Sequence, residues 1–245
     1  MQKTWKVRPH DQALVASIEK ANGVSPVVAQ LLAARGITDR HQIAEFLDKP
    51  FQNLRAPLLL PGVDKASERM FEAIQSGEKI CIYGDYDADG MTATAILVRC
   101  IRMLGGNVTY FVPSRLDDGY GLSDQALEKV HKEGAKLVVT VDCGVSSIHE
   151  AETAKQLGMD LIITDHHQFG ESLPDVVAIV HPALPGHEYP FAGLCGAGVA
   201  LKLAWALCQR ASGDKKVSDA QRNFLLIALG LAAIGTVADV VPLLD

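Results

Sequence analysis

Acidic side chains and two imidazoles follow directly after short apolar runs at several places in the chain. In chain order these residues are Asp85, Asp87, Asp89, Asp142, Asp165, His166 and His167, and Asp239 follows the last apolar run, which is longer and is expected to be a helix. If the apolar runs are parallel strands, their carboxyl ends share one edge of a sheet and bring these groups together. Carboxylates that converge repel one another unless some are protonated or a multivalent cation neutralises them. The residue types therefore predict a site for divalent metal ions.

The chemistry of these side chains narrows the choice of metal and reaction. Carboxylate and imidazole ligands together suit Mn²⁺ or Mg²⁺. The groups are more numerous than one ion needs, so two ions that share a bridging carboxylate are expected. Two-metal sites of this kind serve phosphoester hydrolysis, where one ion generates hydroxide and both stabilise the in-line transition state. The five cysteines form no C-x-x-C pair, which argues against a zinc ribbon or a disulfide framework.

Several of these positions also have a purely structural interpretation. An acid at a strand end, such as Asp85, is equally typical of a helix N-cap. Asp165 can orient a neighbouring histidine instead of binding metal. Arg115 suits bidentate binding of a substrate phosphate, or an ion pair with a nearby surface acid. The glycines in the stretch 193–198 suit a phosphate cradle at a helix start, although close helix packing explains them as well.

The apolar pattern around these groups predicts alternating strands and helices. Strands are expected at 80–83, 108–112, 137–141, 161–164 and 176–180, and helices at 64–75, 91–104, 123–133, 146–157, 197–211 and 218–235. The strands are continuous apolar runs, which is typical of parallel strands covered on both faces. We therefore expect an α/β fold, with a doubly wound, mostly parallel sheet and helices on both faces. The last two helices are expected to pack on that sheet.

The first 60 residues have a different pattern and predict a helical N-terminal extension. Ser25 is a candidate N-cap for a helix with apolar residues at helical spacing, and a second short helix is expected after Thr38. The prolines at 50, 57 and 61 interrupt the pattern before the α/β region begins. The expected division is therefore residues 1–60 and 61–245.

Composition bounds the partners and the location of the protein. The 245 residues include 23 Lys and Arg against 29 Asp and Glu, a net charge of −6. A protein held to nucleic acid mainly by a basic surface is usually net positive. Here the six clustered acids account for the whole excess of acidic over basic residues, and two divalent ions would offset about four of their negative charges. The net charge therefore does not exclude a nucleic-acid substrate. The N-terminus lacks a signal-peptide pattern, and the longest apolar run, 224–238, is shorter than the roughly 20 residues that a bilayer requires. We therefore expect a cytoplasmic protein without a membrane partner.

Four motifs occur in order along the chain. They are D-x-D-G at 87–90, D-C-G at 142–144, D-H-H at 165–167 and GTVADVVPL at 235–243. This set resembles the DHH phosphoesterase superfamily. Fuller strings are similar to its RecJ branch of bacterial exonucleases, namely YGDYDADG at 83–90, PSR at 113–115 with GYGL at 119–122, and WKVR at 5–8. The resemblance covers nearly the whole chain.

The resemblance implies roles for individual residues. The implied metal ligands are Asp87, Asp89, Asp142, His166 and Asp239, with Asp85 as a further candidate and Asp142 as the bridge between the ions. His167 is implied to lie at the scissile phosphate, and Arg115 to hold substrate phosphate. The implied catalytic set is His167, Asp142 and Asp89. Tyr83 stands where the pyrophosphatase branch carries a histidine, which argues against pyrophosphatase activity.

The resemblance also implies a reaction and partners. The family reaction is Mn²⁺- or Mg²⁺-dependent hydrolysis of single-stranded DNA from its 5′ end, in DNA repair and recombination. A single-strand-binding protein and a helicase are implied partners, and a monomer is expected. RecJ-like enzymes continue past the fourth motif into a DHHA1 domain and an oligonucleotide-binding fold. The sequence stops at Asp245, so we expect a DHH domain without those parts.

Three other functions fit parts of the pattern. A DHH phosphodiesterase acting on short oligonucleotides or cyclic dinucleotides would use the same ligands. A haloacid-dehalogenase-like phosphatase would use Asp87 as a covalent nucleophile, because D-x-D-G followed by Met91 and Thr92 mimics its signature. That interpretation leaves the D-H-H motif unexplained. A non-catalytic binding module of this fold would not need the intact ligand set.

Overall fold

The structure is a computed structural model that describes residues 11–47, 54–114, 121–213 and 216–243. The chain forms two compact units, Met1–Arg55 and Ala56–Asp245. Each unit has its own buried apolar cluster.

The first unit contains three short helices, α1 (Gln12–Asn22), α2 (Pro26–Ala34) and α3 (Arg40–Leu47). Ser25 caps α2 as the sequence predicted, because its side chain accepts a hydrogen bond from the Val28 amide. Helix α1 was not predicted, although Asp11 provides a cap of the same kind by accepting from the Ala13 and Leu14 amides. A small apolar cluster holds the helices together and comprises Val15, Ile18, Ala29, Leu32 and Ile43.

The second unit is built on a five-stranded sheet in the order β2-β1-β3-β4-β5. The strands are β1 (Ile80–Tyr83), β2 (Val108–Phe111), β3 (Leu137–Val141), β4 (Asp160–Thr164) and β5 (Ala178–Val180). Every neighbouring pair is parallel. The central strands are buried on both faces, which explains their continuous apolar runs. The predicted doubly wound parallel sheet is confirmed.

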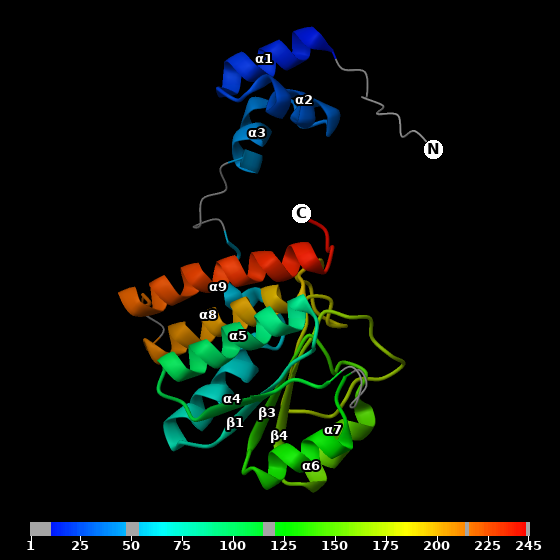
Figure 1. The fold of residues 1–245 in the computed structure, drawn as a ribbon, viewed down its shortest axis with the longest axis vertical. Helices are drawn as coiled ribbons and strands as arrows, with labels where there is room; N and C mark the ends of the chain where they lie inside the picture. Colours follow the sequence, from blue (N-terminus) through cyan, green and yellow to red (C-terminus); the bar gives the residue numbers. More distant parts are fainter. Residues whose placement is uncertain (1–10, 48–53, 115–120, 214–215, 244–245) are drawn as a thin grey trace. The chain divides into compact units, whose positions relative to one another are not determined.

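Helices cover both faces of this sheet (Figure 1). One apolar cluster joins the sheet to α4 (Val63–Ser76), α5 (Ala88–Met103) and α8 (Gly196–Ala211). The opposite cluster joins it to α6 (Asp124–Lys132) and α7 (Ile148–Gln156). Alternate residues of each strand point to the two clusters, as the pleat requires: Ile80 and Ile82 enter the first, and Cys81 and Tyr83 the second.

Helix α9 (Asp219–Ala238) forms an outer layer over α5 and α8 (Figure 1). The sequence predicted that α9 packs on the sheet, and this prediction is wrong. The sheet face on this side is already covered by α4, α5 and α8, so the apolar side of α9 is buried against the helices instead.

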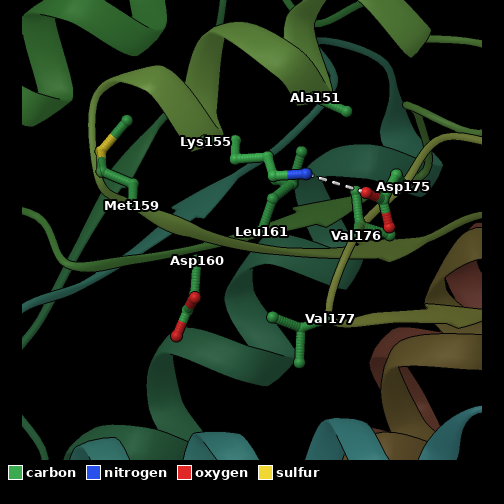
Figure 2. A pocket seen from close by; sticks show the side chains of 8 residues that line it. All are labelled: Ala151, Lys155, Met159, Asp160, Leu161, Asp175, Val176 and Val177. Carbon is green, nitrogen blue, oxygen red and sulfur yellow. Dashed lines mark hydrogen bonds and ion pairs between the residues drawn. The ribbon is translucent and has the colours of Figure 1, made fainter.

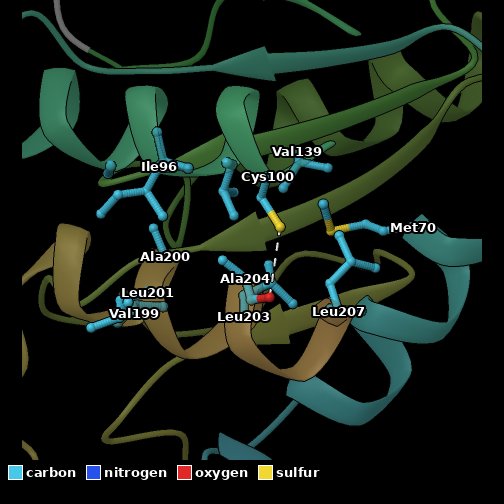
Figure 3. Close-up of a cluster of buried hydrophobic side chains, with 14 of the residues drawn as sticks. Met70, Ile96, Cys100, Val139, Val199, Ala200, Leu201, Leu203, Ala204 and Leu207 are labelled. Atoms are coloured by element: carbon cyan, nitrogen blue, oxygen red, sulfur yellow. Dashed lines mark hydrogen bonds between the residues drawn. The ribbon is translucent and has the colours of Figure 1, made fainter. Parts of the chain in front are cut away.

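Close packing between α5, α8 and α4 fixes the position of α8 (Figure 3). Ile96 and Cys100 of α5 meet Leu203 and Leu207 of α8, and Met70 of α4 lies beside them. Burying one such aliphatic side chain contributes about 1.5–3 kcal/mol. All five cysteines are buried free thiols. A tightly packed α8 holds its N-terminus at the carboxyl edge of the sheet, where the candidate residues lie.

Helix α9 is also long and apolar enough to cross a membrane, judged by length and composition alone. The apolar run 224–238 is only part of this helix, which begins earlier, at Asp219. The expectation that this segment is too short is therefore wrong. Core helices of soluble proteins pass the same test, and α9 packs on α5 and α8.

Candidate metal centre

The loop after β1 and the first turn of α5 place three acids at the carboxyl end of β1. Asp87 is the N-cap of α5, since its Oδ1 accepts a hydrogen bond from the Gly90 amide at 2.9 Å. Helix α5 therefore begins at Ala88, three residues before the predicted start. Asp85 is buried, and its Oδ1 accepts from the Tyr86 amide at 2.6 Å. The cap is thus Asp87, and Asp85 lies deeper in the cluster.

Asp89 is held by the N-terminus of α8. The Gly196 amide donates to Asp89 Oδ2 at 2.6 Å, and the Ala197 amide donates to Oδ1 at 2.9 Å. The positive end of the helix dipole also favours the carboxylate. These two amides of the glycine-rich stretch 193–198 therefore bind a carboxylate of the protein rather than a phosphate of a ligand. This contact was not predicted, and its one signal in the sequence is the run of small residues that opens α8.

Asp142 follows β3 in an uncommon backbone conformation, with φ of 64°. Few residue types adopt positive φ, and aspartate is among the more tolerant of them. Asp142 is 1% exposed, and its side chain lies against Gly196, where an added Cβ would come within 2.6 Å of Asp142 Oδ1. A glycine is therefore needed at 196 to let this carboxylate approach α8.

His166 connects the ends of β1, β3, β4 and α9. Its Nε2 lies 3.0 Å from Asp142 Oδ1, and 3.7 Å and 3.6 Å from Oδ2 of Asp89 and Asp239. Asp239 reaches the cluster because it is the C-cap residue of α9. The centre of the cluster lies between β1 and β3, where the strand order reverses and where ligands of open α/β sheets bind.

Two buried atoms at the centre of the cluster have no hydrogen-bond partner in the described part of the chain. Among the described residues, neither Asp142 Oδ1 nor His166 Nε2 makes a hydrogen bond, although the two atoms are 3.0 Å apart. A buried polar atom without a partner costs about 1–3 kcal/mol. A divalent cation bound between the two atoms would remove this cost, so the donor set fits a metal ion.

The remaining candidates extend the same cluster. Three overlapping triplets each offer ligand atoms within 4.8 Å of one another, namely Asp85, Asp87 and Asp142; Asp89, His166 and Asp239; and Asp142, His166 and His167. The structure thus brings together the seven side chains of these triplets, all of which the sequence singled out. Arg115 lies outside the described residues.

Asp165 has a different role from its neighbours. Its Oδ1 accepts from His167 Nδ1 at 2.7 Å and from the amides of His166 and His167. Its Oδ2 accepts from the Val145 amide at 2.9 Å. The carboxylate is therefore fully engaged in holding the loop and the His167 ring, which is the orienting role that the sequence left open for it.

Burial and close charges shift the titration of the cluster. Burial raises the pKa of Asp142 to about 7, despite the nearby His166. Burial also raises the pKa of Asp85 and of Asp239. The hydrogen bond that His167 donates to Asp165 raises the pKa of His167 to about 9, so its imidazole is positively charged at neutral pH. Burial opposes the ionisation of Asp165, but hydrogen bonds from His167 and Val145 outweigh it and lower the pKa of Asp165. A bound cation would favour the ionised form of the carboxylates.

A separate pocket of about 240 Å³ lies between α7, β4 and the segment before β5 (Figure 2). Its polar residues are Asp160 and the ion pair of Lys155 with Asp175, whose Nζ and Oδ2 are 3.0 Å apart. Asp160 is the first residue of β4, whereas the acidic cluster follows the ends of the strands. The pocket contains none of the candidate residues.

Comparison with known proteins agrees with this geometry. The model of the DHH family, N-terminal domain, matches residues 79–236. The single-stranded-DNA-specific exonuclease RecJ of Bacillus subtilis is 42% identical over 98% of this chain and 29% of its own length. RecJ of Escherichia coli is also 42% identical, over 89% of this chain and 38% of its own length. The chain thus spans less than two fifths of the length of these relatives.

Solved structures give the same result. RecJ of Thermus thermophilus in complex with Mn²⁺ has a TM-score of 0.71 and 34% identity, covering 96% of this chain and 31% of that chain. Exonuclease RecJ bound to manganese has a TM-score of 0.67 and 40% identity, covering 77% and 46%. The family match spans more than half of the chain, includes the first three motifs in full, and excludes the haloacid-dehalogenase-like alternative. The chain therefore belongs to the DHH family.

Proposed function

We propose that this chain is a metal-dependent phosphodiesterase that hydrolyses single-stranded DNA from its 5′ end. The observation that carries the proposal is the buried pair of atoms Asp142 Oδ1 and His166 Nε2, surrounded by carboxylates at the edge of the sheet. The identity to RecJ exonucleases supports the choice of substrate. Tyr83 stands at the position where the pyrophosphatase branch carries a histidine. Its hydroxyl donates a hydrogen bond to Gly121 O at 3.0 Å.

The proposed ligands of two Mn²⁺ or Mg²⁺ ions are Asp87, Asp89, Asp142, His166 and Asp239, with Asp85 as an additional candidate. Asp142 belongs to two of the three triplets, and this position suits a carboxylate that bridges two ions. When bound, the ions would supply a hydroxide at neutral pH and would stabilise negative charge on the phosphate.

The chain itself contributes orientation and charge. The α8 amides hold Asp89, so a ligand carboxylate is in place before substrate arrives. Asp165 holds the positively charged ring of His167, which we propose donates a hydrogen bond to the scissile phosphate. The catalytic set is then His167, Asp142 and Asp89. Arg115 is the proposed second contact to substrate phosphate, together with His167, on family resemblance.

The biological setting follows from the same family resemblance. We propose a role in DNA repair and recombination, with a single-strand-binding protein and a helicase as partners, and a monomer in the cytoplasm. Residues 61–245 are the proposed catalytic DHH domain and residues 1–60 its helical extension. In the structure the division between the two units falls after Arg55.

The proposed function is tested with end-labelled DNA. The protein is incubated with Mn²⁺ and single-stranded DNA labelled at the 5′ or the 3′ end, beside a cyclic dinucleotide, pyrophosphate and a generic phosphomonoester. We expect mononucleotides to be released from the 5′ end, and this release to stop in EDTA and in Asp142→Ala. Hydrolysis of the dinucleotide but not of DNA would favour the short-substrate alternative. Activity on the monoester alone, or activity that survives Asp142→Ala, would refute the proposal.

In the metal-free protein, the free energy of unfolding should fall as the pH rises. The folded-state pKa of His167 is about 9, above the ordinary value of roughly 6.5, so its contribution to stability is present below pH 6.5 and is lost as the pH approaches 9. The pKa of Asp142 is about 7, above the ordinary value of roughly 3.9, so its contribution is lost between those values. Both effects have the same sign. We expect the Tm of EDTA-treated protein to fall by about 3 °C or more between pH 6.5 and 8.5.

Mn²⁺ provides the comparison for this prediction. The ion competes with protons for the carboxylates and for His166, so it should raise the Tm more at pH 8.5 than at pH 6.5. Differential scanning calorimetry at the two pH values, with EDTA or with Mn²⁺, measures both effects. A Tm that is level or rises with pH in EDTA would contradict the prediction.

A further inference from the structure

A buried histidine outside the metal cluster contacts the D-H-H loop. His181 follows β5 directly and is 1% exposed. Its Nδ1 accepts a hydrogen bond from the Ala183 amide at 3.0 Å, and its Nε2 lies 2.9 Å from the backbone carbonyl of His167. An amide can only donate and a carbonyl can only accept, so the ring is neutral and carries its proton on Nε2.

The surroundings of this ring support the neutral form and a single orientation. The ring of Phe169 packs against it, with centroids 4.3 Å apart and planes at 47°. Burial lowers the pKa of His181 and outweighs the carbonyl of His167, which acts in the opposite direction. With both nitrogens bonded and one face covered, the imidazole has little freedom to rotate.

The hydrogen bond from His181 restrains the one polar backbone group of His167 that Asp165 does not hold. Asp165 holds the His167 amide at 3.1 Å and its ring Nδ1 at 2.7 Å, both through Oδ1. His181 holds the remaining backbone polar group, the carbonyl. The residue before His167 is the candidate ligand His166, so a shift of this backbone would displace both imidazoles. The restraint comes from the β5 segment, next to the strand that carries the motif.

We propose that His181 is a positioning residue, which sets the placement of the His167 ring at the substrate phosphate through the hydrogen bond from Nε2 to the His167 carbonyl. This inference rests on the proposed function of the same site. The competing possibility is that His181 matters only for its own turn, through the contact of Nδ1 with the Ala183 amide.

Two substitutions separate these contacts. Glutamine places an amide nitrogen near the position of Nε2, so His181→Gln can keep the bond to the His167 carbonyl. Asparagine places its oxygen near the position of Nδ1, so His181→Asn keeps the turn to Ala183 as an Asx-turn and loses the bond to His167. His187→Asn is the matched control, because this histidine is exposed six residues further along the same segment.

The readout is steady-state kinetics on 5′-phosphorylated single-stranded DNA with Mn²⁺, beside thermal unfolding. We expect His181→Asn to lower kcat by about 10–100-fold with little change in KM, as loss of a residue that orients a ligand group does. His181→Gln should stay within about 3-fold of the unsubstituted protein, and His187→Asn should match it. Equal activity of His181→Asn and the unsubstituted protein, or a larger loss in His181→Gln than in His181→Asn, would overturn the inference.

A second readout does not depend on catalysis. In ¹⁵N-histidine-labelled, metal-free protein, NMR spectra should show His181 as the Nε2–H tautomer and should show the His167 ring signals moved in His181→Asn and nearly unmoved in His181→Gln. If the unsubstituted protein releases no nucleotide from DNA, the proposed function is wrong, and these signals still decide the role of His181. Unmoved His167 signals in His181→Asn would overturn it.

Discussion

Replacing Asp142 with asparagine is expected to lower kcat/KM on single-stranded DNA by about 10³-fold or more, while it stabilises the metal-free protein. The activity falls because the proposed bridge between two ions loses a negatively charged ligand oxygen, and electrostatic stabilisation of the transition state supplies much of the rate enhancement in such reactions. Radiolabelled nucleotide release and Mn²⁺ titration calorimetry measure the loss of turnover and of metal affinity.

The gain in stability has a separate cause. Asp142 is almost fully buried, and its pKa of about 7 means that at pH 8 the metal-free protein carries a buried charge there. Asparagine is neutral, similar in shape, and tolerates the φ of 64° at this position. The Tm of the metal-free variant at pH 8 should therefore rise by about 2–4 °C, the shift that about 1 kcal/mol produces in a chain of this size.

Asp175→Asn is the matched control for this prediction. It is the same chemical change at an acid whose side chain is 86% exposed and pairs with the exposed Lys155. Surface ion pairs of this kind contribute little, so activity and Tm should both stay near those of the unsubstituted protein. An Asp142→Asn variant that keeps a tenth of the activity would rule out Asp142 as the bridging ligand.

Gly235→Ala is expected to disrupt the metal centre and to destabilise the fold. A Cβ at position 235 would collide with Asp89 Oδ1 and would come within 2.8 Å of the Ala197 Cβ. Asp89 is buried and bound by the α8 amides, so it cannot move away without breaking those bonds. We expect a loss of about 1–3 kcal/mol in the free energy of unfolding and Mn²⁺ binding at least about 10-fold weaker.

Gly230→Ala tests the same substitution on the same helix where there is space. Among the residues that the structure describes, no atom lies within 4 Å of a Cβ at position 230, and the residue is exposed. Alanine is the better helix former, so the free energy of unfolding should increase by about 0.5–1 kcal/mol with Mn²⁺ affinity unchanged. Urea unfolding and calorimetry of both variants measure the contrast. Equal effects of the two substitutions would show that the packing of α9 on Asp89 is not important for the site.

The sequence predicted the sheet and the candidate residues because both depend on local patterns. Continuous apolar runs separated by helical segments indicate parallel strands, and the acids that follow three of these runs must then lie at one edge. Asp85, Asp142 and His166 could be assigned to a common site in this way. The C-terminal end of α9 was not predicted correctly, because the helix was expected at 218–235 and it extends to Ala238.

The roles of individual side chains were less predictable. Asp87 and Asp85 are equivalent in the sequence pattern, yet only Asp87 caps α5. Asp165 belongs to the same motif as His166, yet it holds the neighbouring His167 ring through hydrogen bonds. Such choices depend on rotamers and on the space that the surrounding loops leave, which a one-dimensional pattern does not contain.

The sequence by itself determined the family motifs, the parallel sheet and the set of acids and imidazoles at its edge, since each follows from residues close together in the chain. Only the tertiary structure decided which groups hold the others in place. Three such contacts join separate elements of the fold. The α8 amides bind Asp89, Gly235 of α9 leaves space for that carboxylate, and His181 donates a hydrogen bond to the His167 carbonyl. The physical reason is that hydrogen bonds and steric limits act over a few ångströms, so they are set when helices and strands pack, whatever the distance between their residues along the chain.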